Sequence, residues 1–129
     1  IVQGDATELP WDDNFFDVIV SHGTLDSMPF ETACAAVKES HRVLQTDGLF
    51  YCDLISGDDS DHSREYSGEE KVTSDFEEGT IQSYFNYCKI SSLIDDLFEK
   101  TDCYLVRNED VVSGGYVSRY HLTLERCDV

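Results

Sequence analysis

The sequence has no apolar run long enough to span a membrane. Its longest runs, such as Val18–Val20, are far shorter than the stretch of about 20 residues that a membrane-spanning helix needs. No basic segment followed by an apolar one stands at the start of the chain, so we expect no secretion signal. The sequence therefore predicts a protein without a membrane partner.

Basic residues are also scarce. Lysine and arginine together number 9 against 27 aspartates and glutamates, which gives a net charge of −18 and a sequence pI near 4.2. A field of this sign repels phosphate backbones and anionic lipids, so we expect no nucleic acid as a partner. A small anionic substrate held by a local patch stays possible. Such acidity is equally typical of proteins adapted to salt or kept soluble by their charge.

Cysteines are present, but not in metal-binding or redox pairs. None forms a C-x-x-C pair or lies near a histidine at zinc-finger spacing, so we predict no metal site. Each stands in an apolar stretch, where a free cysteine behaves as a small hydrophobe. Their odd number, without a secretion signal, favours a reducing cytoplasm. The five are Cys34, Cys52, Cys88, Cys103 and Cys127.

The length and composition predict a single folded domain over residues 1–129. Hydrophobic residues make up 40 % of the chain and aromatic residues 12 %, which is enough for a packed core. The chain begins at Ile1, within a run typical of the end of a buried strand over residues 1–5. This start favours a fragment, a processed product or a trimmed form of a longer protein.

The first half of the chain has the pattern of a strand, a helix and a second strand. Residues 16–21 form a β-branched run without polar alternation, typical of a strand covered on both faces. Helical spacing of apolar residues follows from about residue 30 to about 44, and Asp47-Gly48 then turns the chain into a buried strand over 49–55. We expect residues 17–21 and 49–55 to be neighbouring parallel strands, with the helix on one face.

The second half is more varied. Residues 57–79 are strongly acidic, and we expect them to be a mobile excursion with a short helix, not a second domain. Residues 81–87 are strand-like, and Ser92 has the pattern of a helix cap before an apolar seam. A short strand is expected over 103–106. Residues 116–126 alternate between apolar and polar, which is typical of an antiparallel strand.

Three sequence blocks in this order resemble class I S-adenosylmethionine-dependent methyltransferases. They are Gly4-Asp5-Ala6-x-x-Leu9-Pro10-Trp11, then Phe16-Asp17-Val18-Ile19-Val20-Ser21-His22, then Arg42-Val43-Leu44-x-x-Asp47-Gly48-Leu49. The resemblance, which covers most of the chain, implies an α/β fold. The expected fold is a Rossmann-like three-layer sandwich with a mostly parallel sheet and an antiparallel C-terminal strand, truncated at its N-terminus. It also implies S-adenosylmethionine as cofactor.

The same resemblance assigns cofactor-binding residues. Asp5 matches the carboxylate that hydrogen-bonds the adenine amino group, and Ala6 matches the residue whose backbone N–H meets the adenine ring. Ser21 and His22 match the end of the strand that faces the methionine part of the cofactor, and open α/β sheets bind ligands at such strand ends. A loop carboxylate that caps a nearby helix is the alternative role for Asp5.

His22 is also the candidate catalytic residue. A histidine with an ordinary pKa of about 6.5 can remove a proton from a methyl acceptor. The alternative is a structural or cofactor-lining role, because an acceptor that is already nucleophilic needs only proximity and orientation. The run His22-Gly23-Thr24-Leu25-Asp26 also resembles the K-G-T-L-D segment of some protein-lysine methyltransferases, although Ser21-His22 replaces the Asp-Lys usual there.

Tyr84 and Phe85 are the candidate substrate-binding residues, in an aromatic run that could wall an acceptor pocket. The alternative is that both rings pack in the core, as aromatic residues at strand spacing usually do.

The family's glycine-rich cofactor loop and its ribose-binding acidic residue have no match in this sequence. Gly114-Gly115 comes too late in the chain and precedes an alternating strand. We therefore expect part of a cofactor site, weak binding of S-adenosylmethionine and no activity from this fragment alone.

Three functional hypotheses follow. The first is a methyltransferase whose acceptor is a small molecule or a protein side chain. The second is a catalytically silent binding or dimerisation module with the same fold. The third, an acidic adaptor with generic α/β character, accounts for the composition but not for the three blocks.

The assembly expected from the sequence is a homodimer. In the family's sheet, two strands separate the strand ending at residue 3 from the strand over 16–21, and neither is present here. The apolar run Val18–Val20 then has an open edge, and no proline or lysine within it discourages pairing with another chain. The alternative is a monomer in which residues 1–3 close directly onto this edge.

Overall fold

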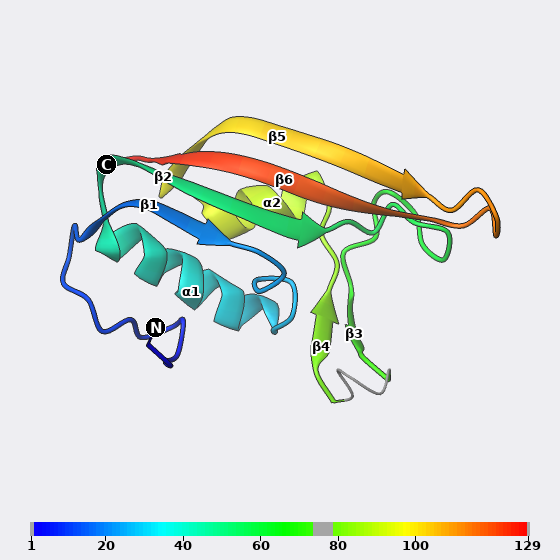
Figure 1. The fold of residues 1–129 in the computed structure, drawn as a ribbon, viewed down its shortest axis with the longest axis horizontal. Helices are drawn as coiled ribbons and strands as arrows, with labels where there is room; N and C mark the ends of the chain where they lie inside the picture. The colour runs from blue at the N-terminus through cyan, green and yellow to red at the C-terminus, as the bar shows by residue number, and fades with distance from the viewer. Residues whose placement is uncertain (1, 74–78, 129) are drawn as a thin grey trace.

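The main sheet has four strands and mixed direction. The structure, a computed structural model, describes residues 2–73 and 79–128 (Figure 1). The strand order is β1-β2-β6-β5, in which β1 and β2 are parallel and the other two pairings are antiparallel. This arrangement confirms the predicted α/β fold with an antiparallel C-terminal strand. The strands are β1 (Phe16–Ser21), β2 (Leu44–Ile55), β5 (Phe98–Glu109) and β6 (Tyr116–Arg126).

The predicted strand–helix–strand unit is confirmed. Helix α1 (Phe30–Val43) joins β1 to β2, and Pro29 precedes its first turn. Val18 pairs with Leu49 and Ser21 with Cys52, so the two strands run side by side in the same direction. Their carboxyl ends therefore lie together at one end of the sheet.

The described helices cover one face of the sheet. Buried residues of α1 and of α2 (Tyr87–Ile94) pack into a single core against alternate side chains of β2 and β6. The side chains between them point to the opposite face of the sheet, which stays open. On this face Val20 of β1 is 71 % exposed. The described residues thus form two of the three layers expected from the sequence. The other exposed apolar side chains of this face are Val18, Tyr51, Tyr104, Val106 and Val117.

The N-terminal residues do not form the predicted strand. Residues 2–4 have no regular structure, and the first backbone pairing is a bridge between Asp5 and Glu8. Ile1 lies outside the described residues. Among the described residues, no strand pairs with the free edge of β1, so the alternative to the dimer, closure of residues 1–3 onto that edge, does not occur for residues 2 and 3. A short extended segment without a neighbouring strand cannot form a ladder.

Helix α2 begins earlier than predicted. Its cap is Asn86, whose Oδ1 accepts the Lys89 backbone N–H at 2.8 Å, and the helix ends at Ile94. Ser92, the predicted cap, lies inside the helix and donates its hydroxyl to the Cys88 carbonyl. The strand expected over 81–87 ends at Ser83, because the cap at Asn86 starts the helix there. The strand expected over 103–106 is part of the longer β5.

A small hairpin begins in the acidic segment and ends just after it. Strands β3 (Glu69–Lys71) and β4 (Ile81–Ser83) pair antiparallel, separately from the main sheet (Figure 1). Residues 57–73 and 79 contain no helix, so the predicted short helix is absent from them, and 74–78 lie outside the described residues. The hairpin is tied to the rest of the molecule by Glu69, whose carboxylate accepts the Phe30 N–H at the start of α1.

His62 organises the acidic segment. Its Nδ1 lies 2.8 Å from Asp59 Oδ1 and its Nε2 lies 2.7 Å from Glu70 Oε2. Its ring stacks on Tyr66, with centroids 4.2 Å apart, and Tyr84 lies against it at 4.7 Å. Burial lowers the pKa of His62, but the hydrogen bonds to Glu70 and Asp59 outweigh it and leave the pKa raised. The segment is therefore built around a histidine held between two carboxylates.

None of the described helices is both long and apolar enough to cross a bilayer.

Candidate functional site

An apolar groove lies beside β1 and brings three predicted cofactor residues together. It has a volume of about 370 Å³ and is bounded by the N-terminal segment, the edge of β1 and one side of α1. Ala6, Ser21 and His22 all line it, although Ala6 stands well apart from the other two in the sequence. The remaining walls are mainly apolar, and include Leu9, Trp11, Phe16, Val18, Val20, Leu25, Ala36 and Val43.

The N-terminal wall of the groove is held on α1 by a cluster of charged side chains. Glu39 accepts the Leu9 N–H at 2.8 Å, and Arg42 donates to the Leu9 carbonyl at 3.0 Å and to Asp13 at 2.8 Å. The hydrogen bond from Arg42, together with that from Leu9, lowers the pKa of Glu39 to about 2. Both charged groups project from the last turns of α1, so the helix fixes where the Ala6 segment runs.

Asp5 is exposed and borders Ala6 in the chain. Its Oδ1 accepts hydrogen bonds from the Thr7 backbone N–H at 2.9 Å and from the Thr7 hydroxyl at 2.7 Å. These two bonds lower its pKa, so the side chain is a carboxylate at neutral pH. They form a local turn. At the start of α1 the Phe30 N–H is bonded to Glu69, so Asp5 does not fill the alternative role of capping that helix terminus.

A polar cluster occupies the carboxyl ends of β1 and β2. His22 directly follows β1, and its Nδ1 lies 2.7 Å from Oδ2 of Asp53 on β2. Asp53 Oδ1 accepts the Gly23 N–H at 2.7 Å. Gly23 has a φ of +64°, a conformation that glycine adopts without strain, and this turn aims its N–H at the carboxylate.

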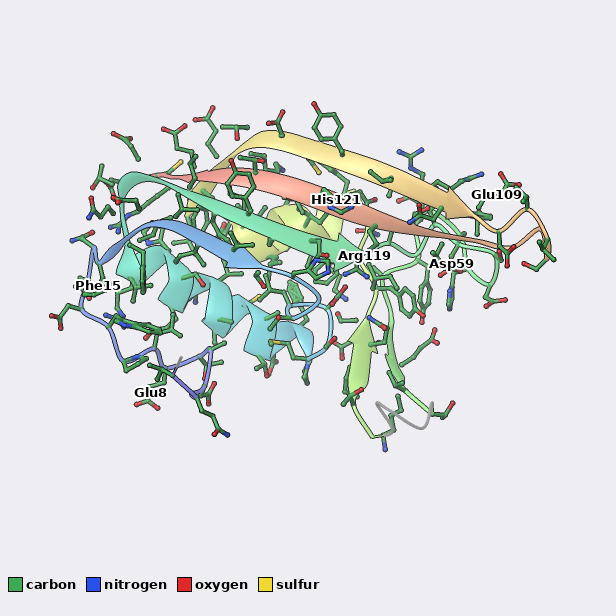
Figure 2. The ribbon with its side chains drawn as sticks, in the orientation of Figure 1. Glu8, Phe15, Asp59, Glu109, Arg119 and His121 are labelled. Atoms are coloured by element: carbon green, nitrogen blue, oxygen red, sulfur yellow. The ribbon has the colours of Figure 1, made fainter. Side chains whose placement is uncertain are left out.

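Arg119 on β6, labelled in Figure 2, joins this cluster to a second buried aspartate, Asp26. It donates to Asp26 Oδ2 at 2.8 Å, and its Nε lies 3.3 Å from Asp53 Oδ2. Asp26 also accepts the Ile55 N–H at 2.7 Å. Burial raises the pKa of Asp53, but the Gly23 hydrogen bond and the Arg119 charge outweigh it and leave this pKa lowered. Asp53 is therefore ionised, and both aspartates are held in fixed positions by their hydrogen-bond and ion-pair partners.

His22 is the side chain that links the groove to this cluster. Its side chain is 85 % exposed, whereas that of Asp53 is 4 % exposed. The histidine also borders a smaller pocket of about 220 Å³ on the open face of the sheet, together with Tyr51, Asp53 and His121. An exposed imidazole beside a buried carboxylate can exchange a proton with a molecule in the groove.

The two candidate substrate-binding residues occupy different environments. Phe85 is fully buried and belongs to the core, where it stacks against Phe30. This is the position that the core-packing alternative predicts, and it leaves Phe85 no surface with which to touch an acceptor. Tyr84 is half-buried and lies against His62 in the acidic segment, away from the core.

Asp53 and Arg119 are site residues that the sequence patterns did not single out, and Asp26 ends the His22–Asp26 run without a role assigned to it there. A signal existed for Asp53, which is an acidic residue inside the buried apolar run of 49–55. Its partners come from the loop after β1 and from β6, and they meet only because β6 pairs with β2, with Ile55 opposite Arg119. No local pattern encodes that register.

Known proteins resemble this chain in sequence over its first 52 residues and in fold over nearly its whole length. Residues 1–52 match the family of methyltransferase domains. Over 52 residues the chain is 42 % identical to the demethylmenaquinone methyltransferases of two strains of Staphylococcus epidermidis and of Staphylococcus carnosus. This alignment spans 40 % of the chain but only 21 % of each relative, so the chain matches about a fifth of their length.

Solved structures share the fold over nearly the whole chain. A SAM-dependent methyltransferase from Methanosarcina mazei superposes with a TM-score of 0.76 at 18 % identity, over 95 % of this chain and 65 % of that one. The 1,6-didemethyltoxoflavin-N1-methyltransferase of Burkholderia thailandensis, solved with bound 1,6-didemethyltoxoflavin and S-adenosylhomocysteine, gives a TM-score of 0.73 at 16 % identity. That superposition covers 95 % of this chain and 48 % of the other. Residues 1–52 thus carry the sequence pattern of the methyltransferase domain family, and the described residues have the class I, Rossmann-like fold of S-adenosylmethionine-dependent methyltransferases.

Proposed function

We propose that the protein takes part in transferring a methyl group from S-adenosylmethionine to a small molecule or a protein side chain. The observation that carries the proposal is the meeting of Ala6, Ser21 and His22 around one groove at the carboxyl end of β1. Ligands of open α/β sheets bind outside such strand ends. The match of residues 1–52 to methyltransferase domains supports the same assignment.

The groove residues fit part of the cofactor. An adenine ring suits the apolar walls formed by Ala6, Leu9 and Trp11, and the carboxylate of Asp5 beside them suits its amino group. Asp5 Oδ1 is engaged by Thr7, which leaves Oδ2 to accept the adenine hydrogen bond. Ser21 and His22 offer polar groups at the end of β1, toward the methionine part.

When bound, the cofactor supplies an electrophilic methyl carbon, whose bond to the sulfonium sulfur breaks with the electron pair staying on sulfur. An acceptor N–H or O–H must lose a proton as its lone pair forms the new bond to carbon. In this chain His22 is the group placed to take that proton, since it lines the groove and is exposed. We assign it the role of general base.

Tyr84 keeps its proposed role as a wall for the acceptor, whereas Phe85 serves the core. The support for Tyr84 is its ring contact with His62 of the acidic segment, a segment that Glu69 ties to the start of α1. The acidic character of that segment suits a neutral or cationic acceptor better than an anionic one.

We also propose a cytoplasmic location and a homodimer formed through the free edge of β1. All five cysteines are free, which suits a reducing compartment. The edge strand β1 has no second strand partner among the described residues, and its Val18 and Val20 side chains are exposed.

Titration of the ¹⁵N-labelled chain with S-adenosylhomocysteine tests the cofactor assignment. We expect weak binding, with a Kd of about 1 mM. This sequence has no glycine-rich turn whose backbone N–H groups could add hydrogen bonds to the ligand. The amides of Ala6, Ser21 and His22 should shift, and those of β5 near Glu109 should not. A uniform response, or none at millimolar ligand, would remove the cofactor assignment.

The Asp5→Asn variant sharpens this test. Asparagine keeps an oxygen for the Thr7 turn but loses the charged acceptor, so affinity should fall by about 1–3 kcal/mol. Asp12→Asn is the matched control, because it removes the same charge from the same segment. Equal weakening by both variants would mean that only net charge matters, and that Asp5 makes no specific bond.

A further inference from the structure

We propose that Asp53 is a positioning residue that holds His22 by Nδ1, so that the Nε2 lone pair faces the groove as the proton acceptor. The inference rests on the proposed role of His22 as general base and deepens it. It names the residue, on another strand, that sets the tautomer and the direction of the imidazole.

Asp53 is fixed independently of His22. It is 3 % exposed, and its Oδ1 accepts the Gly23 N–H at 2.7 Å. The guanidinium of Arg119 lies beside its Oδ2, and is itself anchored by Asp26. A carboxylate held by a backbone N–H and by an anchored guanidinium does not follow the movements of an exposed ring.

The second oxygen of Asp53 lacks a hydrogen bond that His22 can supply. Among the described residues no group donates an aligned hydrogen bond to Asp53 Oδ2, although it is buried. His22 Nδ1 lies 2.7 Å away, close enough but not aligned. The His22 ring is exposed on most of its surface, so no packing blocks the turn about its Cβ–Cγ bond that would bring the N–H into line with the oxygen. Buried acceptors without a donor are costly, so this turn is favoured.

The resulting hydrogen bond fixes the tautomer. An ionised carboxylate only accepts, so the His22 nitrogen that faces Asp53 must carry the proton. The other nitrogen, Nε2, then keeps its lone pair. The proton that leaves an acceptor N–H or O–H goes to this Nε2, its electron pair staying on the acceptor atom. The imidazolium so formed lies beside the Asp53 carboxylate, which stabilises its charge.

The test reads the tautomer of His22 directly in the full chain. Two-bond ¹H–¹⁵N correlation of the imidazole rings, recorded above the titration of the ring, distinguishes a protonated Nδ1 from a protonated Nε2. His22→Gln assigns the signal. We expect His22 to carry its proton on Nδ1, and Asp53→Asn, whose amide can donate to Nδ1, to move the proton to Nε2.

His41 serves as an internal reference. Its Nε2 lies 2.9 Å from the Cys127 carbonyl, which can only accept, so it should carry its proton on Nε2 in both proteins. A wild-type His22 with its proton on Nε2 would overturn the proposal, whether or not Asp53→Asn folds. So would an unchanged tautomer in a folded Asp53→Asn protein. The readout needs neither cofactor nor acceptor, so failure of S-adenosylhomocysteine binding would count against the proposed function and leave this result standing.

Discussion

His62 shows how a single side chain can hold together a segment of mostly like charge. Residues 57–79 are rich in carboxylates, and those of Asp59 and Glu70 approach the same imidazole from opposite sides. Tyr66 adds its hydroxyl, which donates to Glu70 at 2.5 Å. A protonated His62 therefore attracts both carboxylates and offsets the repulsion between them.

The stability of the protein should depend on the protonation of His62. Because its folded pKa is raised, its contribution is fully present below the unfolded value of about 6.5 and is lost as pH rises through the folded pKa. Relative to His62→Gln, the wild-type free energy of unfolding should fall by about 1 kcal/mol over that window. Urea unfolding of both proteins at a series of pH values measures the difference.

His121→Gln is the control for this experiment, because His121 is exposed on the open face of the sheet. Its difference from wild type should not vary in the same way with pH. A wild-type to His62→Gln difference that stays flat between about pH 6 and pH 9 would mean that folding does not raise the pKa of His62.

At the scale of elements, α2 depends on one side chain for its start. Asn86 Oδ1 accepts the Lys89 N–H, which would otherwise lack a partner in the first turn. The ammonium group of Lys89 donates hydrogen bonds to the carbonyls of Ser67 and Tyr84. The same turn therefore also holds the acidic segment in place through Ser67. The cap therefore supports two elements together.

Asn86→Ala should destabilise the protein by about 1 kcal/mol, through loss of the cap. Ser92→Ala should change the stability by less than about 0.5 kcal/mol, because its hydroxyl only donates to a carbonyl within the helix. Thermal unfolding of both variants checks the pair. The reverse order of effects would place the start of the helix at Ser92.

The helices and strands differ in how well the sequence predicts them. The β-branched run Val18–Val20 and the helical spacing after Pro29 are strong local signals, and both elements form where expected. Around Asn86 two signals compete, since Tyr84 and Phe85 favour a strand and Asn86 favours a cap. The aromatic signal dominated the prediction, but the cap determines the structure.

The residues of the site also differ in how far the sequence predicts them. Ala6, Ser21 and His22 could be named because they lie in sequence blocks with a recognisable order, and the fold places them around one groove. Arg119 could not be named, because its relation to Asp26 and Asp53 depends on the register between β2 and β6. Register over a long sequence separation follows from packing of the whole sheet, and no short motif carries it.

At the scale of the whole molecule, the open edge of β1 governs how copies associate. If two chains pair there, the purified protein should have the mass of a dimer at tens of micromolar by light scattering, as edges of this kind recruit strands. Val20→Lys should shift it to a monomer, because a lysine on an edge strand discourages pairing with another chain.

Val112→Lys is the matched control, since Val112 is 94 % exposed in the loop between β5 and β6 and lies far from that edge. It should leave the dimer unchanged. A monomeric wild-type mass at the same concentration would remove the dimer and leave β1 as a solvated edge.

The order of strands in the sheet also has a consequence for how the chain reaches its fold. Strands β5 and β6 are joined by a short loop, and Glu109 pairs with Tyr116, so this hairpin closes at little cost in chain entropy. Strand β2 must instead find β6 from far along the chain, with Leu49 opposite Glu125. Contacts of long separation are slow to form. We therefore expect the hairpin to form early, and the Asp53–Arg119 cluster, which needs the β2–β6 pairing, to form after it.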